Sequence, residues 1–300
     1  MKLLLLNVLF FHFLLGYDYT LKPEKVNATT YCFFGLAEAM DEHNNGNMVN
    51  SCFVNTGTHY LVIDSGPTYQ FAKQAYTKMK EIQALPISFV INTHTHDDHW
   101  LGNAYYRELG VDILGSKEFA NEPKAQETRM QKRITKEAYK GTSQVFPNLF
   151  VEGKKTLEID GKKVIIKSVN KKAHSKSDLY IYIPEYATVF AGDLVFNERI
   201  PSIRDGNLRN WIEALDTVKS MDAQYIIGGH GKLVDKHSVD ATYKYLSELT
   251  EGVSLALEEG TDITQTLDSV KMEDFKDFKM YDTLHRQNIE TAYRILEWEE

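Results

Sequence analysis

The sequence predicts an α/β fold in which two β-sheets pack face to face and helices cover their outer faces. Two observations support this prediction. Short apolar runs rich in β-branched residues, typical of strands, alternate with amphipathic stretches typical of helices, in the repeated order strands, then helix. Histidines and aspartates follow several apolar runs, at the strand ends where open α/β sheets place ligand sites. Two sheets with helices outside them would bury both apolar faces, so we expect four layers.

The first sixteen residues differ from the rest of the chain. Lys2 precedes an apolar run from Leu3 to Leu15 and a small residue, Gly16, which is the pattern of a secretory signal peptide. Because a membrane-spanning helix needs about 20 apolar residues, this run is short for one. We expect residues 1–16 to be a cleaved leader, with an uncleaved N-terminal anchor as the alternative. The remaining chain is then exported, periplasmic or secreted, and not stably inserted in a membrane.

Composition and charge restrict the class of partner. The chain has 300 residues, of which 43% are hydrophobic, an ordinary proportion for a globular protein. Its formal net charge is -8, and it contains no long basic stretch. Nucleic acid is therefore not an expected partner, and a small-molecule substrate is expected instead.

The first half of the chain carries five apolar runs that predict strands. They lie near residues 29–34, 50–56, 59–64, 87–92 and 111–114. The first two runs contain the two cysteines, Cys32 and Cys52, and are expected to be adjacent and antiparallel. Because export leads to an oxidising compartment, a disulfide between them is one expectation and two buried thiols are the other. A helix is predicted from Tyr69 to about Gln83, and Asp64 could cap it.

The segment after the fourth predicted strand holds three histidines and two aspartates within six residues. His94 and His96 are two positions apart on an extended segment, so both rings can point to one side. After the chain turns, Asp98 and His99 can face a second point nearby. Imidazole and carboxylate suit a divalent ion such as zinc, so the spacing predicts ligands for two neighbouring metals. The alternative is a solvated loop with Asp97 or Asp98 as a helix N-cap.

The second half continues the alternation. It predicts a hairpin over residues 154–168 with its turn at Asp160-Gly161, strands near 179–184, 187–191 and 225–227, and a helix from about Asn207 to Met221. Residues 236–300 predict a long helix to about Glu258 and one or two further helices with an apolar face. We expect these helices to form an extension packed on the preceding domain. The alternative is that their apolar face forms a dimer contact, so the sequence is compatible with both a monomer and a homodimer.

The pattern H-x-H-x-D-H at residues 94–99, followed in order by His174, Asp193 and His230, resembles the signature of the metallo-β-lactamase-fold hydrolases. Taken singly, each of the three later residues could equally be a surface, turn or loop residue. The resemblance covers roughly residues 28 to 235. It implies the four-layer αβ/βα sandwich of that family, with residues 17–235 as the catalytic domain.

This resemblance also implies a metal site. The first metal ion would be held by His94, His96 and His174, and the second by Asp98, His99 and His230, with Asp193 bridging the two. Two zinc ions are expected, ahead of iron or manganese. A hydroxide bridging the metals would attack a carbonyl or phosphoryl centre, and Asp98 would stabilise the departing anion or orient the nucleophile.

The residue at position 193 decides which activity the resemblance implies. β-Lactamases of this fold carry cysteine or a non-bridging residue there. A bridging carboxylate, which Asp193 would supply, resembles the arrangement in glyoxalase II, lactonases and phosphodiesterases. We therefore expect a di-zinc hydrolase of an ester, thioester, lactone or amide bond in a small molecule. The alternatives are a class B β-lactamase, a mononuclear iron oxygenase of the persulfide dioxygenase kind, and a non-catalytic binding protein.

Further features follow from the family pattern. Asp64 stands where the family has an aspartate that supports the metal loop. The charged, helix-prone residues 117–140 are expected to form a solvated outer helix, with a place beside the active-site mouth as the alternative. Candidates for lining the mouth are Trp100, Asn103, Arg199 and Arg204, each with packing or solvent exposure as its alternative. The stretch Phe190–Trp211 and the region around Asn288 also resemble a periplasmic branch associated with sulfur oxidation and quinoprotein relays.

Overall fold

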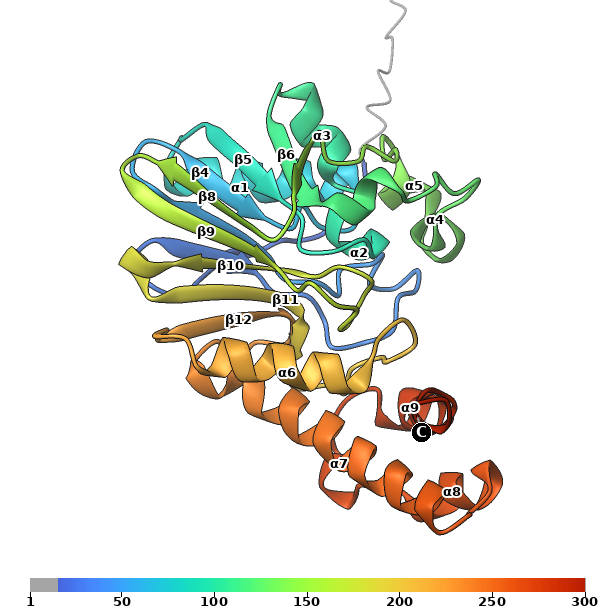
Figure 1. Cartoon of the computed structure of the whole chain (residues 1–300). Coiled ribbons are helices and arrows are strands. Elements are labelled where there is room, and N and C mark those ends of the chain that lie inside the picture. The colour runs from blue at the N-terminus through green and yellow to red at the C-terminus, as the bar shows by residue number, and fades with distance from the viewer. Residues whose placement is uncertain (1–15, 300) are drawn as a thin grey trace, which may run out of the picture.

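The computed structural model describes residues 16–299 and contains four layers in the order helix, sheet, sheet, helix (Figure 1). The αβ/βα sandwich expected from the sequence is confirmed. The predicted signal peptide, apart from Gly16, lies outside the described residues. None of the helices formed by residues 16–299 is both long enough and apolar enough to cross a membrane.

The larger sheet contains seven strands that lie side by side in chain order. They are β1 (Glu24–Lys25), β2 (Thr30–Phe33), β3 (Ser51–Asn55), β4 (Tyr60–Ile63), β5 (Ile87–Ile91), β6 (Asp112–Ser116) and β7 (Leu149–Val151). The pairs from β1 to β4 are antiparallel and those from β4 to β7 are parallel. Since β4 and β5 run in the same direction, Asp64 and the histidine loop follow them at one edge of the sheet.

The smaller sheet contains five strands in the order β12-β11-β10-β9-β8. They are β8 (Lys154–Ile159), β9 (Lys162–Ser168), β10 (Leu179–Ile183), β11 (Thr188–Phe196) and β12 (Tyr225–His230). Neighbours are antiparallel except β11 and β12, which are parallel. The hairpin turn at Asp160-Gly161 is confirmed, and both residues have positive φ, as a two-residue hairpin turn requires. Strand β11 extends past its predicted end at Ala191.

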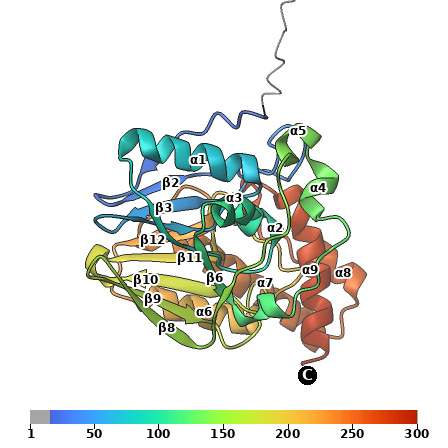
Figure 2. The same ribbon diagram turned by 90° about the horizontal axis from the view of Figure 1, so that it is seen from above.

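Helices cover the outer face of each sheet, as Figures 1 and 2 show. The longer ones are α1 (Tyr69–Ile82), α3 (Asn103–Glu108), α6 (Leu208–Lys219), α7 (Asp240–Glu258), α8 (Ile263–Ser269) and α9 (Tyr281–Glu297). The short ones are α2 (Asp97–Trp100), η1 (Lys117–Ala120), α4 (Arg129–Arg133), α5 (Lys136–Tyr139), η2 (Pro184–Tyr186), η3 (Lys236–Val239) and η4 (Glu273–Phe275). The cap of α1 is Thr68, whose hydroxyl accepts from Phe71 N, so Asp64 does not cap this helix.

Side-chain alternation assigns each strand face to one of the buried layers. In β4, Leu61 and Ile63 face the smaller sheet, whereas Val62 faces the helical layer that contains α1. The predicted apolar face of α6 is confirmed, because Trp211 and its neighbours on that face are fully buried. Helices α7 and α9 contribute to the same apolar cluster as α6 and β11, so the C-terminal helices pack on the sandwich.

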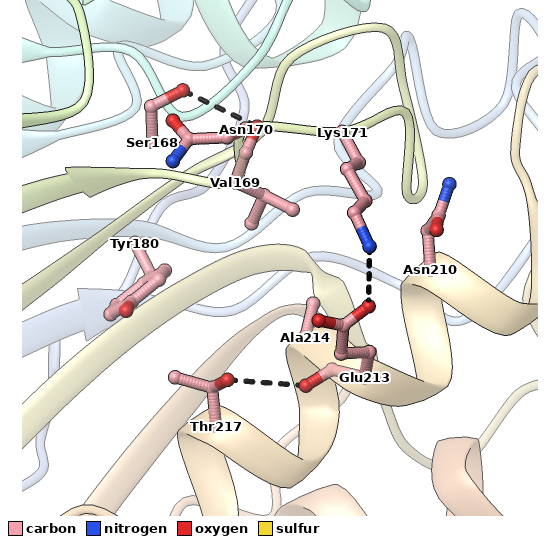
Figure 3. Close-up of a pocket in the computed structure, with 9 residues that line it drawn as sticks. All are labelled: Ser168, Val169, Asn170, Lys171, Tyr180, Asn210, Glu213, Ala214 and Thr217. Carbon is pink, nitrogen blue, oxygen red and sulfur yellow. Dashed lines mark hydrogen bonds and ion pairs between the residues drawn. The ribbon is translucent and has the colours of Figure 1, made fainter.

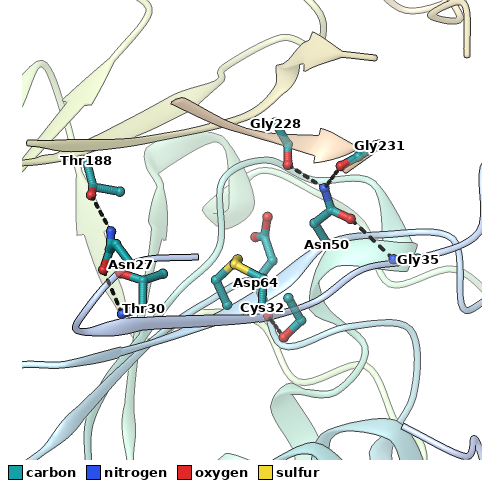
Figure 4. The surroundings of a disulfide bond; sticks show 11 residues. Asn27, Thr30, Cys32, Gly35, Asn50, Asp64, Thr188, Gly228 and Gly231 are labelled. Carbon is teal, nitrogen blue, oxygen red and sulfur yellow. Dashed lines mark hydrogen bonds between the residues drawn. A yellow bond between two sulfur atoms is a disulfide. The ribbon is translucent and has the colours of Figure 1, made fainter. Parts of the chain in front are cut away.

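Strands β2 and β3 are joined by a disulfide between Cys32 and Cys52, which face each other in the antiparallel register. Figure 4 shows this bond close to Asp64 and to Asn50 of the segment that leads into β3. The Asn50 amide donates to the carbonyls of Gly228 and Gly231, at 2.9 and 2.7 Å. This side chain therefore links the larger sheet to the end of β12 in the smaller sheet.

Replacing both cysteines by alanine should lower the stability of the chain. The disulfide closes a loop with a sequence separation of 20, and opening a loop of this size costs about 3 kcal/mol, mainly by freeing the unfolded chain. Urea unfolding of the double variant and the oxidised protein measures the difference. An unchanged free energy of unfolding, together with two titratable thiols in the parent protein, would contradict this expectation.

Candidate metal centre

The structure brings together all seven residues predicted as ligands, from both sheets. His94 and His96 follow β5, Asp98 and His99 lie in α2, His174 lies between β9 and β10, Asp193 lies in β11, and His230 ends β12. They form two groups of potential ligand atoms, His94, His96, His174 and Asp193 in one and Asp98, His99 and His230 in the other. Within each group these atoms lie within 4.8 Å of one another.

The first group is built from three converging ring nitrogens. His96 Nδ1 lies 3.0 Å from His94 Nε2 and 2.9 Å from His174 Nε2. Asp193 Oδ2 lies 3.2 Å from His174 Nε2. Two ligand atoms of a tetrahedral zinc, each about 2.0–2.1 Å from the metal, are about 3.3 Å apart. The spacing of this group therefore fits a tetrahedral metal site.

The second group is slightly wider and meets the first at Asp193. Asp98 Oδ2 lies 3.7 Å from His99 Nε2 and 3.8 Å from His230 Nε2. Asp193 Oδ1 lies 3.1 Å from His99 Nε2, while its Oδ2 lies 3.3 Å from His230 Nε2. The Asp193 carboxylate thus contacts imidazoles of both groups, which is the position that a bridging ligand requires.

Two buried polar atoms at this junction support a metal site independently of spacing. His99 Nε2 and Asp193 Oδ1 lie 3.1 Å apart, but neither atom makes a hydrogen bond of acceptable geometry among residues 16–299. Leaving a buried donor or acceptor unsatisfied costs about 1–3 kcal/mol, and native structures rarely do so without a reason. A cation between the two groups would satisfy both atoms.

In three of the five histidines, the ring nitrogen that faces away from the site is held by a neighbour that fixes the tautomer. His99 Nδ1 donates to Asp64 Oδ2 at 2.8 Å, and His96 Nε2 donates to Asp205 Oδ2 at 3.2 Å. His230 Nδ1 donates to the carbonyl oxygen of Met48 at 2.6 Å. Partners of this kind orient metal-binding histidines and raise their basicity.

Asp64 supports the loop from beneath, as the family pattern implied. Its carboxylate accepts from the backbone N–H of Thr93 at 2.8 Å, from the Thr93 hydroxyl at 2.9 Å, and from His99. Asp64 also has a φ of 55°, the left-handed region that non-glycine residues rarely adopt. Strain of this kind persists where surrounding contacts determine the backbone, and it is concentrated at functional sites.

The pKa values of the histidines in the centre are shifted in both directions. Burial would lower the pKa of His99, but the carboxylates of Asp193, Asp64 and Asp98 raise it well above its usual value, so a cation bound there would displace a proton. Burial lowers the pKa of His94 well below its usual value, and the charge of His99 lowers it further. Burial alone would raise the pKa of Asp193, but the surrounding imidazoles outweigh it and hold this pKa well below its usual range. Neutral imidazole and ionised carboxylate are the forms that bind metals.

Residues 117–140 do not form the solvated outer helix that was expected. They fold into η1, α4 and α5, with Met130 and Ala138 buried, and α4 carries Arg129 to the metal loop. Arg129 Nη2 lies 2.8 Å from Asp97 Oδ1 and 2.7 Å from Asp98 Oδ1. The prediction was wrong because a charged segment with helix propensity does not reveal a contact about thirty residues away in the chain.

Arg129 and Asp205 are functional residues that the sequence reasoning missed. Arg129 holds Asp98 Oδ1, which leaves Asp98 Oδ2 to face His99 and His230. Burial would raise the pKa of Asp98, but the charge of Arg129, followed by those of the histidines, lowers it overall. No local motif marks either residue, so only the fold identifies them.

A hollow of about 50 Å³ is lined by five of the seven candidate ligands, and Arg199 and Arg204 line it as well. Arg199 and Arg204, two of the four residues expected to line the mouth of the active site, therefore lie beside the candidate ligands. Trp100 and Asn103 hold the loop from behind, because the Trp100 indole donates to Thr95 O and the Asn103 amide donates to Asn92 Oδ1. Figure 3 shows a separate hollow of about 260 Å³ beside the Lys171–Glu213 ion pair, which contains none of the predicted ligands.

Comparisons with known proteins agree with this geometry. A sequence model of the metallo-β-lactamase superfamily matches residues 44–230, more than half of the chain. A metallo-β-lactamase from Pontibacter korlensis shares 19% identity with a TM-score of 0.59, over 76% of this chain and 99% of that one.

Two further structures show the same fold. The metallo-β-lactamase FIM-1 from Pseudomonas aeruginosa shares 17% identity with a TM-score of 0.58, over 76% of this chain and 95% of that one. The DIM-1 metallo-β-lactamase shares 15% identity with a TM-score of 0.58, over 76% and 96%. From the family match, the shared fold and the histidine–aspartate clusters, we conclude that the chain belongs to the metallo-β-lactamase superfamily, whose members are generally hydrolases with metal sites.

Proposed function

We propose that this protein is a di-zinc hydrolase that cleaves an ester, thioester, lactone or amide bond in a small molecule. The observation that supports this most directly is the position of Asp193, whose two carboxylate oxygens lie within 3.3 Å of imidazoles from both ligand groups. The first ion would be held by His94, His96 and His174, the second by Asp98, His99 and His230, with Asp193 shared. Five imidazoles and two carboxylates suit zinc.

The chain's residues have separable roles in this proposal. Bound zinc would lower the pKa of a coordinated water to about 7 and so supply hydroxide at neutral pH. Asp98 is the proposed catalytic residue: Arg129 fixes its Oδ1, so that Oδ2 keeps one direction toward the reacting centre. Phe196 stacks on the His230 ring at 4.9 Å, and Trp211 packs on His174, which excludes water from the floor of the site.

A class B β-lactamase is the second candidate. The solved structures that share this fold are described as metallo-β-lactamases, but their identities of 15–19% support only the fold. The carboxylate at position 193 favours the broader hydrolase. Hydrolysis of nitrocefin and a carbapenem, compared with thioester and lactone substrates, separates the two. One iron per chain with oxygen uptake would instead support a persulfide dioxygenase-like oxygenase.

We also propose that the protein acts outside the cytoplasm, in the periplasm or after secretion. The leader-like first sixteen residues support this. The disulfide between Cys32 and Cys52 supports it as well, since disulfides persist in oxidising compartments and are rare in the cytosol.

The purified protein should contain two zinc ions per chain. His96→Ala should lower that number, because it removes His96 Nδ1, which lies beside the ring nitrogens of both His94 and His174. Elemental analysis of dialysed samples measures the metal content. Turnover should fall by about two orders of magnitude or more and should be lost on chelation. His237→Ala, at an exposed histidine that pairs with Asp240, is the matched control and should keep both ions. Full metal content in His96→Ala would refute the assignment.

Asp64→Asn should weaken zinc binding about 10- to 100-fold, because an amide cannot accept from both Thr93 and His99 as the carboxylate does. Competition with a chelating dye measures the affinity. Asp160→Asn is the control: Asp160 also accepts several hydrogen bonds, from Thr56 and Thr58, but lies at the other end of the sandwich. Equal zinc affinities in the two variants would show that Asp64 does not act through the metal loop.

A further inference from the structure

A second hollow, of about 330 Å³, adjoins the metal pocket and shares five of its lining residues. It lies between α4 and α9, which face each other at one end of the molecule (Figures 1 and 2). We call it the arginine groove, because four arginines line it: Arg129, Arg133, Arg199 and Arg204. No aspartate or glutamate is among the described residues that line it. In a chain with a net charge of -8, this separation of charge favours an anionic occupant.

Arg199 is the arginine whose charge is least compensated. Its side chain is buried, with 5% of the residue exposed, yet Nη1 has no hydrogen-bond partner in the described part of the chain. Its one hydrogen bond is long, 3.5 Å from Nε to the carbonyl of Ile200. Burial lowers the pKa of this guanidinium, as expected for a cation removed from water without a bonded carboxylate.

Two of the other arginines have carboxylate partners, and the third, Arg133, is exposed to water. Arg129 is paired with Asp97 and Asp98, and Arg204 is paired with Asp205. The carboxylates of Asp98 and Asp193 act on Arg199 only at longer range, and metal ions would neutralise them. The Arg199 guanidinium also lies 5.7 Å from the centre of the Phe196 ring, a cation–π contact that compensates its charge only in part. A buried cation without a bonded carboxylate is unfavourable, so the site is built to receive a negative group.

The C-terminal helices hold Arg199 in place. The backbone of the Arg199 segment bonds to Lys279, through Ile200 N to Lys279 O at 3.1 Å and Lys279 N to Glu198 O at 3.0 Å. Asn288 of α9 donates to Pro201 O at 2.8 Å and accepts from Ile203 N at 3.2 Å. These contacts come from residues beyond the family match at 44–230, so one wall of the groove is formed by the C-terminal extension, while its arginines lie within the matched region.

The rest of the groove is partly apolar. Its wall includes Met40 and Met48 on one side and Met280 and Leu284 from the region of α9 on the other. Guanidinium groups and apolar side chains lining the same hollow would fit a ligand that has an acid group and a hydrocarbon body.

We propose that the substrate of the metal centre is a small organic anion with an apolar body, whose acid group is bound by Arg199 and whose body lies along α9. This proposal rests on the proposed hydrolase function and names its substrate class. Arg199 is the specificity-determining residue, and the C-terminal helices are the elements that position it.

Calorimetric titration of the zinc-loaded protein tests this with three probes: hexanoate, its neutral counterpart hexanamide, and acetate, which lacks the apolar body. Hexanoate should bind about tenfold or more tightly than either of the others. Arg199→Gln should reduce hexanoate affinity by about tenfold or more, to the level of hexanamide, and Arg199→Lys should restore part of it. Leu284→Ala should weaken hexanoate binding and leave acetate binding unchanged.

Two further variants keep the test decisive. Arg133 is exposed, so Arg133→Gln should fold normally and weaken hexanoate about two- to threefold. Arg286→Gln is the matched control, because Arg286 lies on α9 but pairs with Asp268 outside the groove. It should bind hexanoate like the parent protein.

Zinc content, measured on the same samples, separates the two proposals. If Arg199→Gln retains zinc and binds hexanoate as tightly as the parent, the anion site is wrong. If Arg199→Gln does not fold, unchanged hexanoate affinity in both Arg133→Gln and Leu284→Ala likewise overturns the anion site. A parent protein that holds no zinc contradicts the hydrolase function instead. In that case, hexanoate affinities of the parent and the arginine variants still show whether Arg199 binds an acid group.

Discussion

The carboxylate of Asp193 is the constraint around which the site is arranged. It is buried, and the nearest charged or polar groups are imidazoles from both ligand groups. A buried carboxylate is tolerated only when positive charge compensates it. Two cations held by the five imidazoles would provide that compensation, whereas the histidines alone would have to hold protons in a desolvated cavity. The burial of this one group therefore links the fold to metal binding.

The sandwich supplies the convergence through the ends of its strands and the glycines beside them. Gly192 in β11 has a φ of +53°, and the pairing of β11 with β12 is irregular on both sides of it, so the bulged strand aims Asp193 inward. A Cβ on Gly229 would collide with Asp193 Oδ1. Asn50 fixes the end of β12 from the other sheet (Figure 4). Asp193 and His230 are thus positioned by the backbone of β11 and β12 before any ion binds.

Much of this could be predicted from the sequence, because the signals are local. The apolar runs and the Asp160-Gly161 turn predicted the strands, and the spacing from His94 to His99 predicted two ligand groups. The strand that carries Asp193 was predicted too short, since a bulge interrupts the apolar pattern. The roles of Arg129 and the arginine groove could not be foreseen, because they depend on contacts between segments far apart in the chain.

The central claim is that the two ligand groups hold two metal ions with Asp193 between them. Anomalous diffraction at the zinc absorption edge, from crystals of the zinc-loaded protein, measures this directly. The account predicts two peaks, one among His94, His96 and His174 and the other among Asp98, His99 and His230, with the Asp193 carboxylate between the peaks. A single peak, or none, in crystals grown with excess zinc would contradict it.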